Sequence, residues 1–185
     1  MEELYRFLSI IDLMRGNYNH HGSRVAGYAV KLAAAMGLPD PDIELIRAGA
    51  YLHDVGKLLL DKDLLSLPRK LETDEYEIIQ THSRWGWAIV AQANYAPIIQ
   101  GMVLSHHEKW DGTGYPDQLS GQQIPLAARI LSVCDVYDAL TNWRPYRDAY
   151  SHDFAVAYMQ NGKGTAFEPQ IVDLFFEKVM PTEER

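Results

Sequence analysis

The chain has 185 residues, 47% of them apolar, and a formal net charge of −8 at pH 7. This length suits one domain with a sizeable core. The single cysteine excludes an internal disulfide framework and favours a reducing compartment. The negative charge argues against binding of polymeric nucleic acid, which requires a basic face. Neither an apolar run of about 20 residues nor a signal peptide is present, so we expect a cytoplasmic protein that does not bind membranes.

Apolar residues recur at helical spacing along most of the chain. In chain order, the pattern predicts an N-terminal helix within residues 1–17 and further helices at 23–36, 40–59, 73–82, 95–107, 127–141 and 168–179. Gly37 is the expected C-cap of the helix at 23–36. The Gly- and Pro-rich segments 111–125 and 161–169 are predicted loops. Because no alternating strand pattern is present, we predict an all-α fold with one domain over residues 1–185.

Five of the seven histidines lie in or beside these helices and have acidic or histidine neighbours. They are His21, His53, His82, His106 and His107. A single helical histidine is usually a half-buried packing residue, so none of them is informative alone. Asp135 is harder to explain by packing. A carboxylate flanked by Val133, Cys134 and Val136 is costly to bury unless a cation or a hydrogen-bond donor pairs with it.

The doublets His53–Asp54 and His106–His107 add a second constraint. Neighbouring helical residues point about 100° apart, so a doublet can serve two metal ions or two faces of one. Five imidazoles and two carboxylates, with Asp54 as a bridge, give four contacts to each of two ions. Two ions about 3.5–4 Å apart can clamp a phosphate and generate a bridging hydroxide nucleophile. Such mixed ligation suits iron, manganese, nickel or zinc.

The same residues fall in motifs that resemble the HD-GYP subgroup of the HD phosphohydrolase superfamily. The motifs are HDVGK at 53–57, His82, HHEKWDGTGYP at 106–116 and CDVYDALTNWRPYR at 134–147. The resemblance extends from about residue 18 to the C-terminus. It implies an HD-type helical bundle with additional C-terminal helices. It also implies a metal-dependent phosphodiesterase that hydrolyses cyclic di-GMP to pGpG, or further to GMP.

The resemblance assigns the metal ligands residue by residue. They are His21, His53, Asp54, His82, His106, His107 and Asp135, with Asp54 bridging the two ions. The two ions are then expected to be iron or manganese, with zinc or nickel as alternatives. Asn17 stands where some members of the family carry a glutamate that helps to hold a third ion. We therefore expect two ions.

Lys57 is the second expected catalytic residue, beside Asp54. It follows Asp54 by three residues and His53 by four, so a helix would place it on their face. There it can contact a phosphate oxygen or protonate a leaving oxygen. The alternative is a surface lysine at a helix end.

Substrate contacts are expected from the loop at 111–116 and from the RPYR element. Gly112 and Gly114 permit positive φ and close approach of backbone amides to a ligand, and Tyr115 can stack on guanine. The same loop can also serve as a rigid turn that positions the preceding histidines. Arg144 and Arg147 offer forks for phosphate and guanine, or are two solvated arginines.

Two other functions stay open. The domain can hydrolyse another cyclic dinucleotide or a mononucleotide, as wider HD relatives do. Alternatively, it is an inactive module that binds cyclic di-GMP or a diguanylate cyclase (GGDEF) partner, although the complete ligand set argues against inactivity. No receiver or sensor domain precedes the motifs, so we expect no regulation by an attached domain unless the chain is a fragment.

Overall fold

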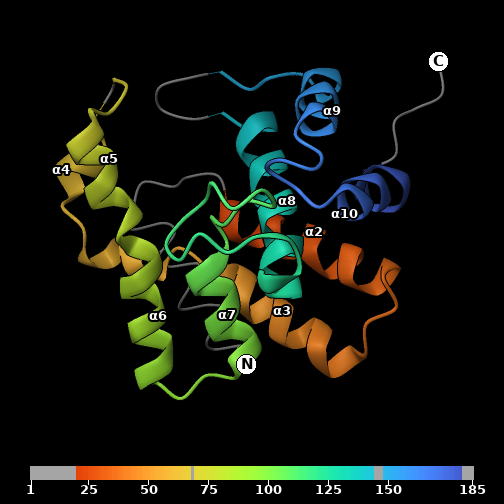
Figure 1. Ribbon diagram of the computed structural model, residues 1–185, viewed down its shortest axis with the longest axis horizontal. Coiled ribbons are helices and arrows are strands. Elements are labelled where there is room, and N and C mark those ends of the chain that lie inside the picture. The colour runs from red at the N-terminus through yellow and green to blue at the C-terminus, as the bar shows by residue number, and fades with distance from the viewer. Residues whose placement is uncertain (1–19, 68, 144–147, 181–185) are drawn as a thin grey trace.

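The computed structural model describes residues 20–67, 69–143 and 148–180. These residues form an all-helical domain (Figure 1). Within them, the β-type pairing is limited to an isolated bridge between Lys163 and Phe167, so the predicted all-α fold is confirmed. The helix expected within residues 1–17 lies outside the described ranges. No helix in those ranges has the length and apolar character that a membrane span requires.

Four helices surround the centre of the domain: α2 (His21–Ala35), α3 (Asp40–Leu52), α7 (Pro97–Ser105) and α8 (Leu126–Thr141). Helix α2 packs against α3 and α8, and both of these contact α7. The buried side of α2 consists largely of small residues, including Ala26, Ala29 and Ala33, which allow neighbouring helix axes to approach closely. Gly37 ends this helix as predicted. Its φ is 74°, and the next amide, that of Leu38, donates to the Ala33 carbonyl at 3.1 Å.

A C-terminal group of helices covers α8. It comprises α9 (His152–Asn161), α10 (Pro169–Leu174) and the π-helix η3 (Phe175–Val179), which lie together on one side of α8 in Figure 1. The last two account for the helix predicted at 168–179. Helix α9 was not predicted, although Ser151 marks its start by accepting a hydrogen bond from the Phe154 amide at 3.2 Å.

The opposite side of the domain contains η1 (Val55–Leu59), α4 (Lys62–Leu65), α5 (Thr73–Gln80) and α6 (His82–Gln92). The 3₁₀-helix η1 packs on α6. Gly56 makes this contact possible, because a Cβ there would collide with the His82 carbonyl and the Gly86 amide. The prediction of one helix over 40–59 is therefore wrong. Helix α3 ends at Leu52, and the chain turns so that Gly56 can meet α6.

Two other predicted helices also end earlier than expected. The helix predicted at 73–82 ends at Gln80 as α5, and α7 ends at Ser105. A separate helix, α6, begins at His82 and was not predicted. The His53–Asp54 and His106–His107 doublets thus follow the ends of α3 and α7, rather than lying within helices. The predicted loop 111–125 contains the short 3₁₀-helix η2 (Gly121–Gln123).

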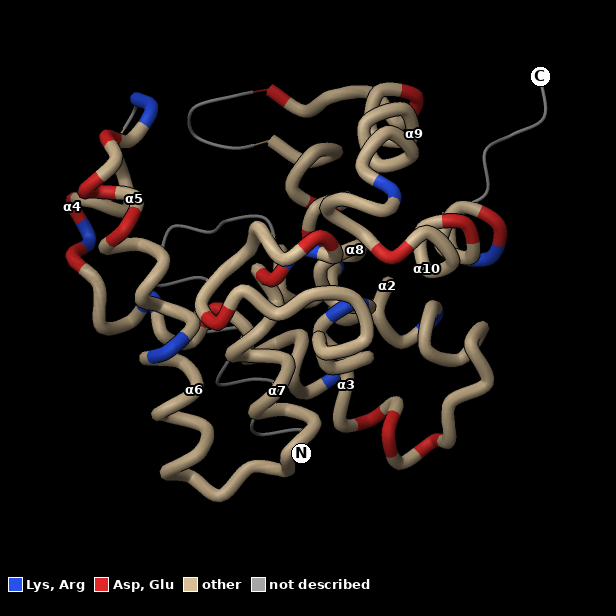
Figure 2. The backbone as a smooth tube through the Cα atoms, viewed as in Figure 1, with Lys and Arg blue, Asp and Glu red and all other residues tan. Residues whose placement is uncertain are grey.

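The net negative charge is not concentrated on one element. Figure 2 shows acidic positions at the start of α3, around α4 and α5, and along the last helix. Basic positions are fewer and scattered among them. The described part of the chain therefore offers no broad basic face of the kind that polymeric nucleic acid requires.

Candidate metal centre

The predicted metal ligands come together from five separate elements. His21 begins α2, His53 and Asp54 follow α3, His82 begins α6, His106 and His107 follow α7, and Asp135 lies within α8. They form two groups, in each of which one ligand atom per residue lies within 4.8 Å of the others. One group is Asp54, His82, His106 and His107, and the other is His21, His53 and Asp54.

Asp54 belongs to both groups, and its two carboxylate oxygens face different histidines. Oδ1 lies 3.5 Å from Nε2 of His82 and 4.0 Å from Nε2 of His106. Oδ2 lies 3.5 Å from Nε2 of His53. A carboxylate divided in this way has the geometry of a bridge between two cations.

Asp135 joins the group of His21 and His53. Its Oδ1 lies 3.1 Å from Nε2 of His21 and 3.9 Å from Nε2 of His53. Burial would raise the pKa of Asp135, but the close contact with His21 and the nearby histidines outweigh burial and hold the pKa well below its usual value. The carboxylate is therefore ionised and available to a cation.

Three histidines use the same local device to fix their protons. Nδ1 of His53 lies 2.7 Å from the Ala50 carbonyl, and Nδ1 of His82 lies 2.7 Å from the Ile79 carbonyl. His106 repeats this arrangement with the Val103 carbonyl at 3.0 Å. In each case the partner is three residues earlier, in the last turn of a helix where carbonyls lack helical partners.

A carbonyl can only accept a hydrogen bond, so the proton of each neutral ring resides on Nδ1. Burial lowers the pKa of His82, and burial together with neighbouring histidines lowers that of His106 well below the usual range. Both rings are therefore neutral at pH 7. Their Nε2 atoms carry lone pairs directed into the centre.

These two lone pairs face each other. Nε2 of His82 and Nε2 of His106 lie 3.2 Å apart, and both side chains are buried. Two acceptors at this distance repel unless a cation lies beside both of them. His107 completes this side of the centre, and burial, reinforced by His82, lowers its pKa to about 3. The set of donors thus fits a divalent transition metal.

Lys57 lies on η1, beside the shared carboxylate. Its Nζ donates to Oδ2 of Asp54 at 2.6 Å, and the lysine is half-buried. Burial would raise the pKa of Asp54, but Lys57 and the surrounding histidines hold it well below its usual value. The expected proximity of Lys57 and Asp54 is therefore present, on a 3₁₀-helix rather than on α3.

Asp138 was not among the site residues predicted from the sequence. This aspartate is fully buried in α8 and accepts a hydrogen bond from Nδ1 of His21 at 2.7 Å. Arg24 donates to both of its oxygens, at 2.6 and 2.9 Å. The signal was available, because Asp138 follows Asp135 by three residues in the same apolar helix, and the argument about buried carboxylates applies equally to it.

The loop after His107 is held against the centre by its glycines and by Glu108. Gly112 has a φ of 82°, as expected, whereas the φ of Gly114 is not positive. A Cβ on Gly114 would instead collide with the backbone of His107, Glu108 and Lys109. The Glu108 carboxylate, which is buried, accepts hydrogen bonds from the amides of residues 117 and 119 at 2.7 and 3.1 Å.

Tyr115 lies over the histidines. Its ring stacks on His107 with a centroid distance of 4.7 Å, and it forms a T-shaped pair with Tyr76 of α5 at a centroid distance of 6.4 Å. Burial raises the pKa of Tyr115, so the hydroxyl is neutral at pH 7. The loop therefore shields one side of the centre with an aromatic ring. Arg144 and Arg147, the other predicted substrate contacts, lie outside the described residues.

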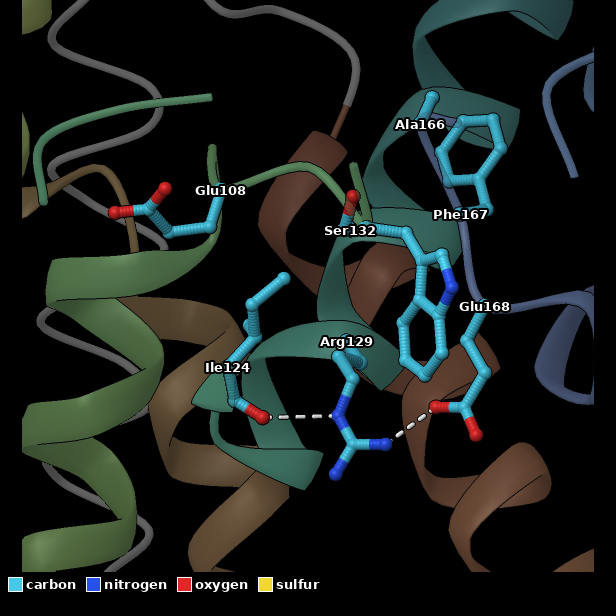
Figure 3. A pocket seen from close by; sticks show the side chains of 8 residues that line it. Glu108, Ile124, Arg129, Ser132, Ala166, Phe167 and Glu168 are labelled. Carbon is cyan, nitrogen blue, oxygen red and sulfur yellow. Dashed lines mark hydrogen bonds and ion pairs between the residues drawn. The ribbon is translucent and has the colours of Figure 1, made fainter. Parts of the chain in front are cut away.

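A small hollow contains none of the candidate metal ligands in its lining. The residues that line it are Glu108, Trp110, Ile124, Arg129, Ser132, Ala166, Phe167 and Glu168. Figure 3 shows Arg129 between Ile124 and Glu168, where it donates to the Ile124 carbonyl and pairs with Glu168. The guanidinium also lies 5.9 Å from the centroid of the Trp110 ring. These contacts join α8 to the segment before α10. The residues around the hollow therefore support the loop that follows His107 and are not part of the candidate site.

Comparison with known proteins identifies the family and agrees with the observed fold. The sequence model of the HD domain family matches residues 7–171. A solved structure described as an HDG"Y"P protein from Bdellovibrio bacteriovorus has the same fold, with a TM-score of 0.71 at 21% identity over 85% of this chain and 51% of that chain. The chain belongs to the HD domain family, and its motifs place it in the HD-GYP group.

Two curated relatives are similar over almost the whole chain. It is 37% identical over 174 residues to the cyclic di-GMP phosphodiesterase response regulator RpfG of Xanthomonas campestris pv. campestris, covering 93% of this chain and 46% of that protein. It is 34% identical over 178 residues to 3'3'-cGAMP-specific phosphodiesterase 2 of Vibrio cholerae, covering 95% of this chain and 34% of that protein. The chain thus spans less than half the length of either relative.

Proposed function

We propose that this chain is a metal-dependent phosphodiesterase that hydrolyses cyclic dinucleotides, with cyclic di-GMP as its substrate. The observation that carries the proposal is the pair of Nε2 atoms of His82 and His106, which lie 3.2 Å apart in rings whose Nδ1 atoms lie 2.7 and 3.0 Å from backbone carbonyls. Such a pair, next to a carboxylate shared with a second group of histidines, is suited to a dinuclear cation site. Relatives with phosphodiesterase names support the reaction class.

In this proposal, Asp54 would serve both of two ions. His82, His106 and His107 would hold one ion, and His21, His53 and Asp135 would hold the other. Iron or manganese is preferred, and zinc or nickel also fits this ligand set. When bound, such ions act as Lewis acids on a phosphate oxygen and on a water molecule.

The protein's own residues have separate roles around the phosphate. Lys57 is beside Asp54 and half-buried, so its ammonium can meet a phosphate oxygen or donate a proton to the leaving ribose oxygen. Gly112, Gly114 and Tyr115 would contact the nucleotide from the loop over the histidines. Arg144 and Arg147 would supply cations for a substrate that the overall negative charge of the chain otherwise repels.

Among cyclic dinucleotides, 3'3'-cGAMP is the specific alternative to cyclic di-GMP as the substrate. The relative named for cyclic di-GMP and the relative named for 3'3'-cGAMP are similar to this chain to nearly the same degree, at 37% and 34% identity. The two ligands differ in one base. Discrimination between them therefore has to arise from contacts to the base edges rather than from the metal centre.

The test is turnover by purified protein loaded with Mn²⁺ or Fe²⁺ under anaerobic conditions. Cyclic di-GMP and 3'3'-cGAMP are supplied separately, and linear dinucleotide and mononucleotide products are resolved by chromatography. We expect cleavage of cyclic di-GMP to pGpG and no cleavage by the Asp54→Asn variant. Preference for 3'3'-cGAMP would agree with the proposed reaction class but contradict cyclic di-GMP as the substrate. If neither ligand is cleaved with either metal, the proposal that the chain is an enzyme is wrong.

A further inference from the structure

The Nδ1 atoms of the histidines in the two ligand groups have different kinds of hydrogen-bond partner. His53, His82 and His106 each lie 2.7 to 3.0 Å from a backbone carbonyl three residues earlier. His21 instead begins its helix, and its Nδ1 lies 2.7 Å from the carboxylate of Asp138, on α8. One ring in the centre is thus fixed by a charged side chain, and three are fixed by the backbone.

The carboxylate of Asp138 has donors on both oxygens. Oδ1 accepts from Nε of Arg24 at 2.6 Å and from Nδ2 of Asn142 at 3.1 Å. Oδ2 accepts from His21 and from Nη2 of Arg24, at 2.7 and 2.9 Å. The buried charge is therefore compensated, which a fully buried carboxylate requires. Both oxygens can only accept, so the proton of His21 is directed to Nδ1.

This arrangement decides what the other nitrogen of His21 can do. Nε2 lies 3.1 Å from Oδ1 of Asp135 and belongs to the group with His53 and Asp54. Two atoms that bind one ion at about 2.0–2.2 Å and at a near-right angle lie about this far apart. A proton on Nε2 would occupy the direction in which an ion has to bind.

We propose that Asp138 is a positioning residue that fixes the tautomer of His21 and so determines whether the ion position of His21, His53, Asp54 and Asp135 can be filled. The inference rests on the proposed metal centre. It goes beyond that centre by making the two ion positions unequal. In one position, His82 and His106 are oriented by backbone carbonyls. The other position contains His21, which is oriented by a carboxylate that lies outside both ligand groups. A carboxylate partner also strengthens a histidine as a ligand.

The Asp138→Asn variant tests this dependence. An amide has a single oxygen, and Arg24 and Asn142 both donate towards this side chain. If the amide oxygen serves them, the amide NH₂ turns to His21, whose Nδ1 must then accept, and the proton moves to Nε2. We expect the ion count per chain, measured by elemental analysis after loading with Mn²⁺ and desalting, to fall from two to one. The electron paramagnetic resonance signal should change from a spin-coupled pair to isolated Mn²⁺.

Arg24→Lys is the matched control, because it removes the bidentate contact to Asp138 while retaining both the carboxylate and a positive charge. It should lower the stability of the metal-free protein to thermal unfolding yet keep two ions. Two ions in Asp138→Asn, or one ion in both variants, would overturn the inference, since Asp138 would then support only the fold. Wild-type protein that binds no Mn²⁺ would overturn the proposed metal centre itself.

A measurement on wild-type protein does not depend on whether the variants fold. In protein loaded with diamagnetic Zn²⁺, long-range proton–nitrogen correlation spectra report which imidazole nitrogen carries the proton. We expect His21 to be protonated on Nδ1, with this proton further downfield than those of His53, His82 and His106 because its acceptor is charged. A proton on Nε2 of His21 would contradict the inference.

Discussion

Nζ of Lys57 lies 2.6 Å from Oδ2 of Asp54, the one carboxylate that belongs to both ligand groups. The lysine is thereby fixed next to the position that a phosphate would take between two cations. Because it is not a metal ligand, its contribution to rate is separable from its contribution to metal binding.

Lys57→Ala should retain both ions and lower kcat by about 10²–10⁴-fold, the usual contribution of a positioned proton donor. Metal content is measured by elemental analysis and kcat by product chromatography. Lys62→Ala provides the control, because Lys62 is an exposed lysine on the neighbouring helix α4 and should change neither quantity. Loss of metal in Lys57→Ala would show that Lys57 orients the Asp54 carboxylate for metal binding and does not act in the reaction itself.

Arg144→Ala and Arg147→Ala should each weaken substrate binding with little effect on folding. The loss of a hydrogen bond to a charged group corresponds to about 1.5–3 kcal/mol, or roughly 10–150-fold in affinity. Steady-state kinetics with cyclic di-GMP give the change in KM. Arg47→Ala serves for comparison, because Arg47 pairs with Glu44 on the surface of α3. An unchanged KM in all three variants would leave Arg144 and Arg147 as ordinary surface charges.

Metal-free protein should lose stability as the pH falls from 7 to 5. In the folded state the pKa values of His82, His106 and His107 lie below their ordinary value of 6.5. The unfolded chain therefore binds protons near pH 6.5 while the folded chain does not, so stability declines below this pH. Each such histidine lowers the free energy of unfolding by up to about 1.4 kcal/mol per pH unit between pH 6.5 and its own pKa in the folded state.

Urea unfolding of chelator-treated protein at several pH values measures this slope. His107→Gln should reduce the slope by the contribution of one histidine. His20→Asn should leave it unchanged, because His20 is exposed and outside both ligand groups. A free energy of unfolding that is constant between pH 7 and pH 5 would contradict the protonation states described for the centre.

The ion count depends on Asn17, which lies outside the described residues. An asparagine offers a neutral amide oxygen and cannot offset the charge of a third divalent ion as a carboxylate can. Protein purified anaerobically should therefore contain two ions per chain, and Asn17→Glu should raise this number towards three. Three tightly held ions in the wild-type chain would show that another acidic residue reaches the site.

Much of the fold follows from local sequence patterns. The helix at 126–141 and the C-terminal helical segment from Pro169 onward match the predicted ranges closely, because apolar periodicity reflects burial of one helix face. The predicted ends of α3 and α7 were wrong. Apolar periodicity does not indicate the last residue of a helix when that end depends on a tertiary contact, such as the contact of Gly56 with the backbone of α6.

The candidate site shows the same division. The motifs identified the histidines and aspartates that converge, but not the way in which they are oriented. The helix-end carbonyls that orient His53, His82 and His106 depend on the true helix ends. The contact between His21 and Asp138 joins residues 117 positions apart, and no local pattern specifies such a pair.

The most direct test of the account is to locate metal ions in crystals of anaerobically purified protein from anomalous diffraction at the edge of the bound metal. The account predicts two peaks with Asp54 between them. One should lie about 2.0–2.3 Å from Nε2 of both His82 and His106, and the other within similar reach of His21 and His53. A crystal of active protein with no peak between His82 and His106 would contradict it.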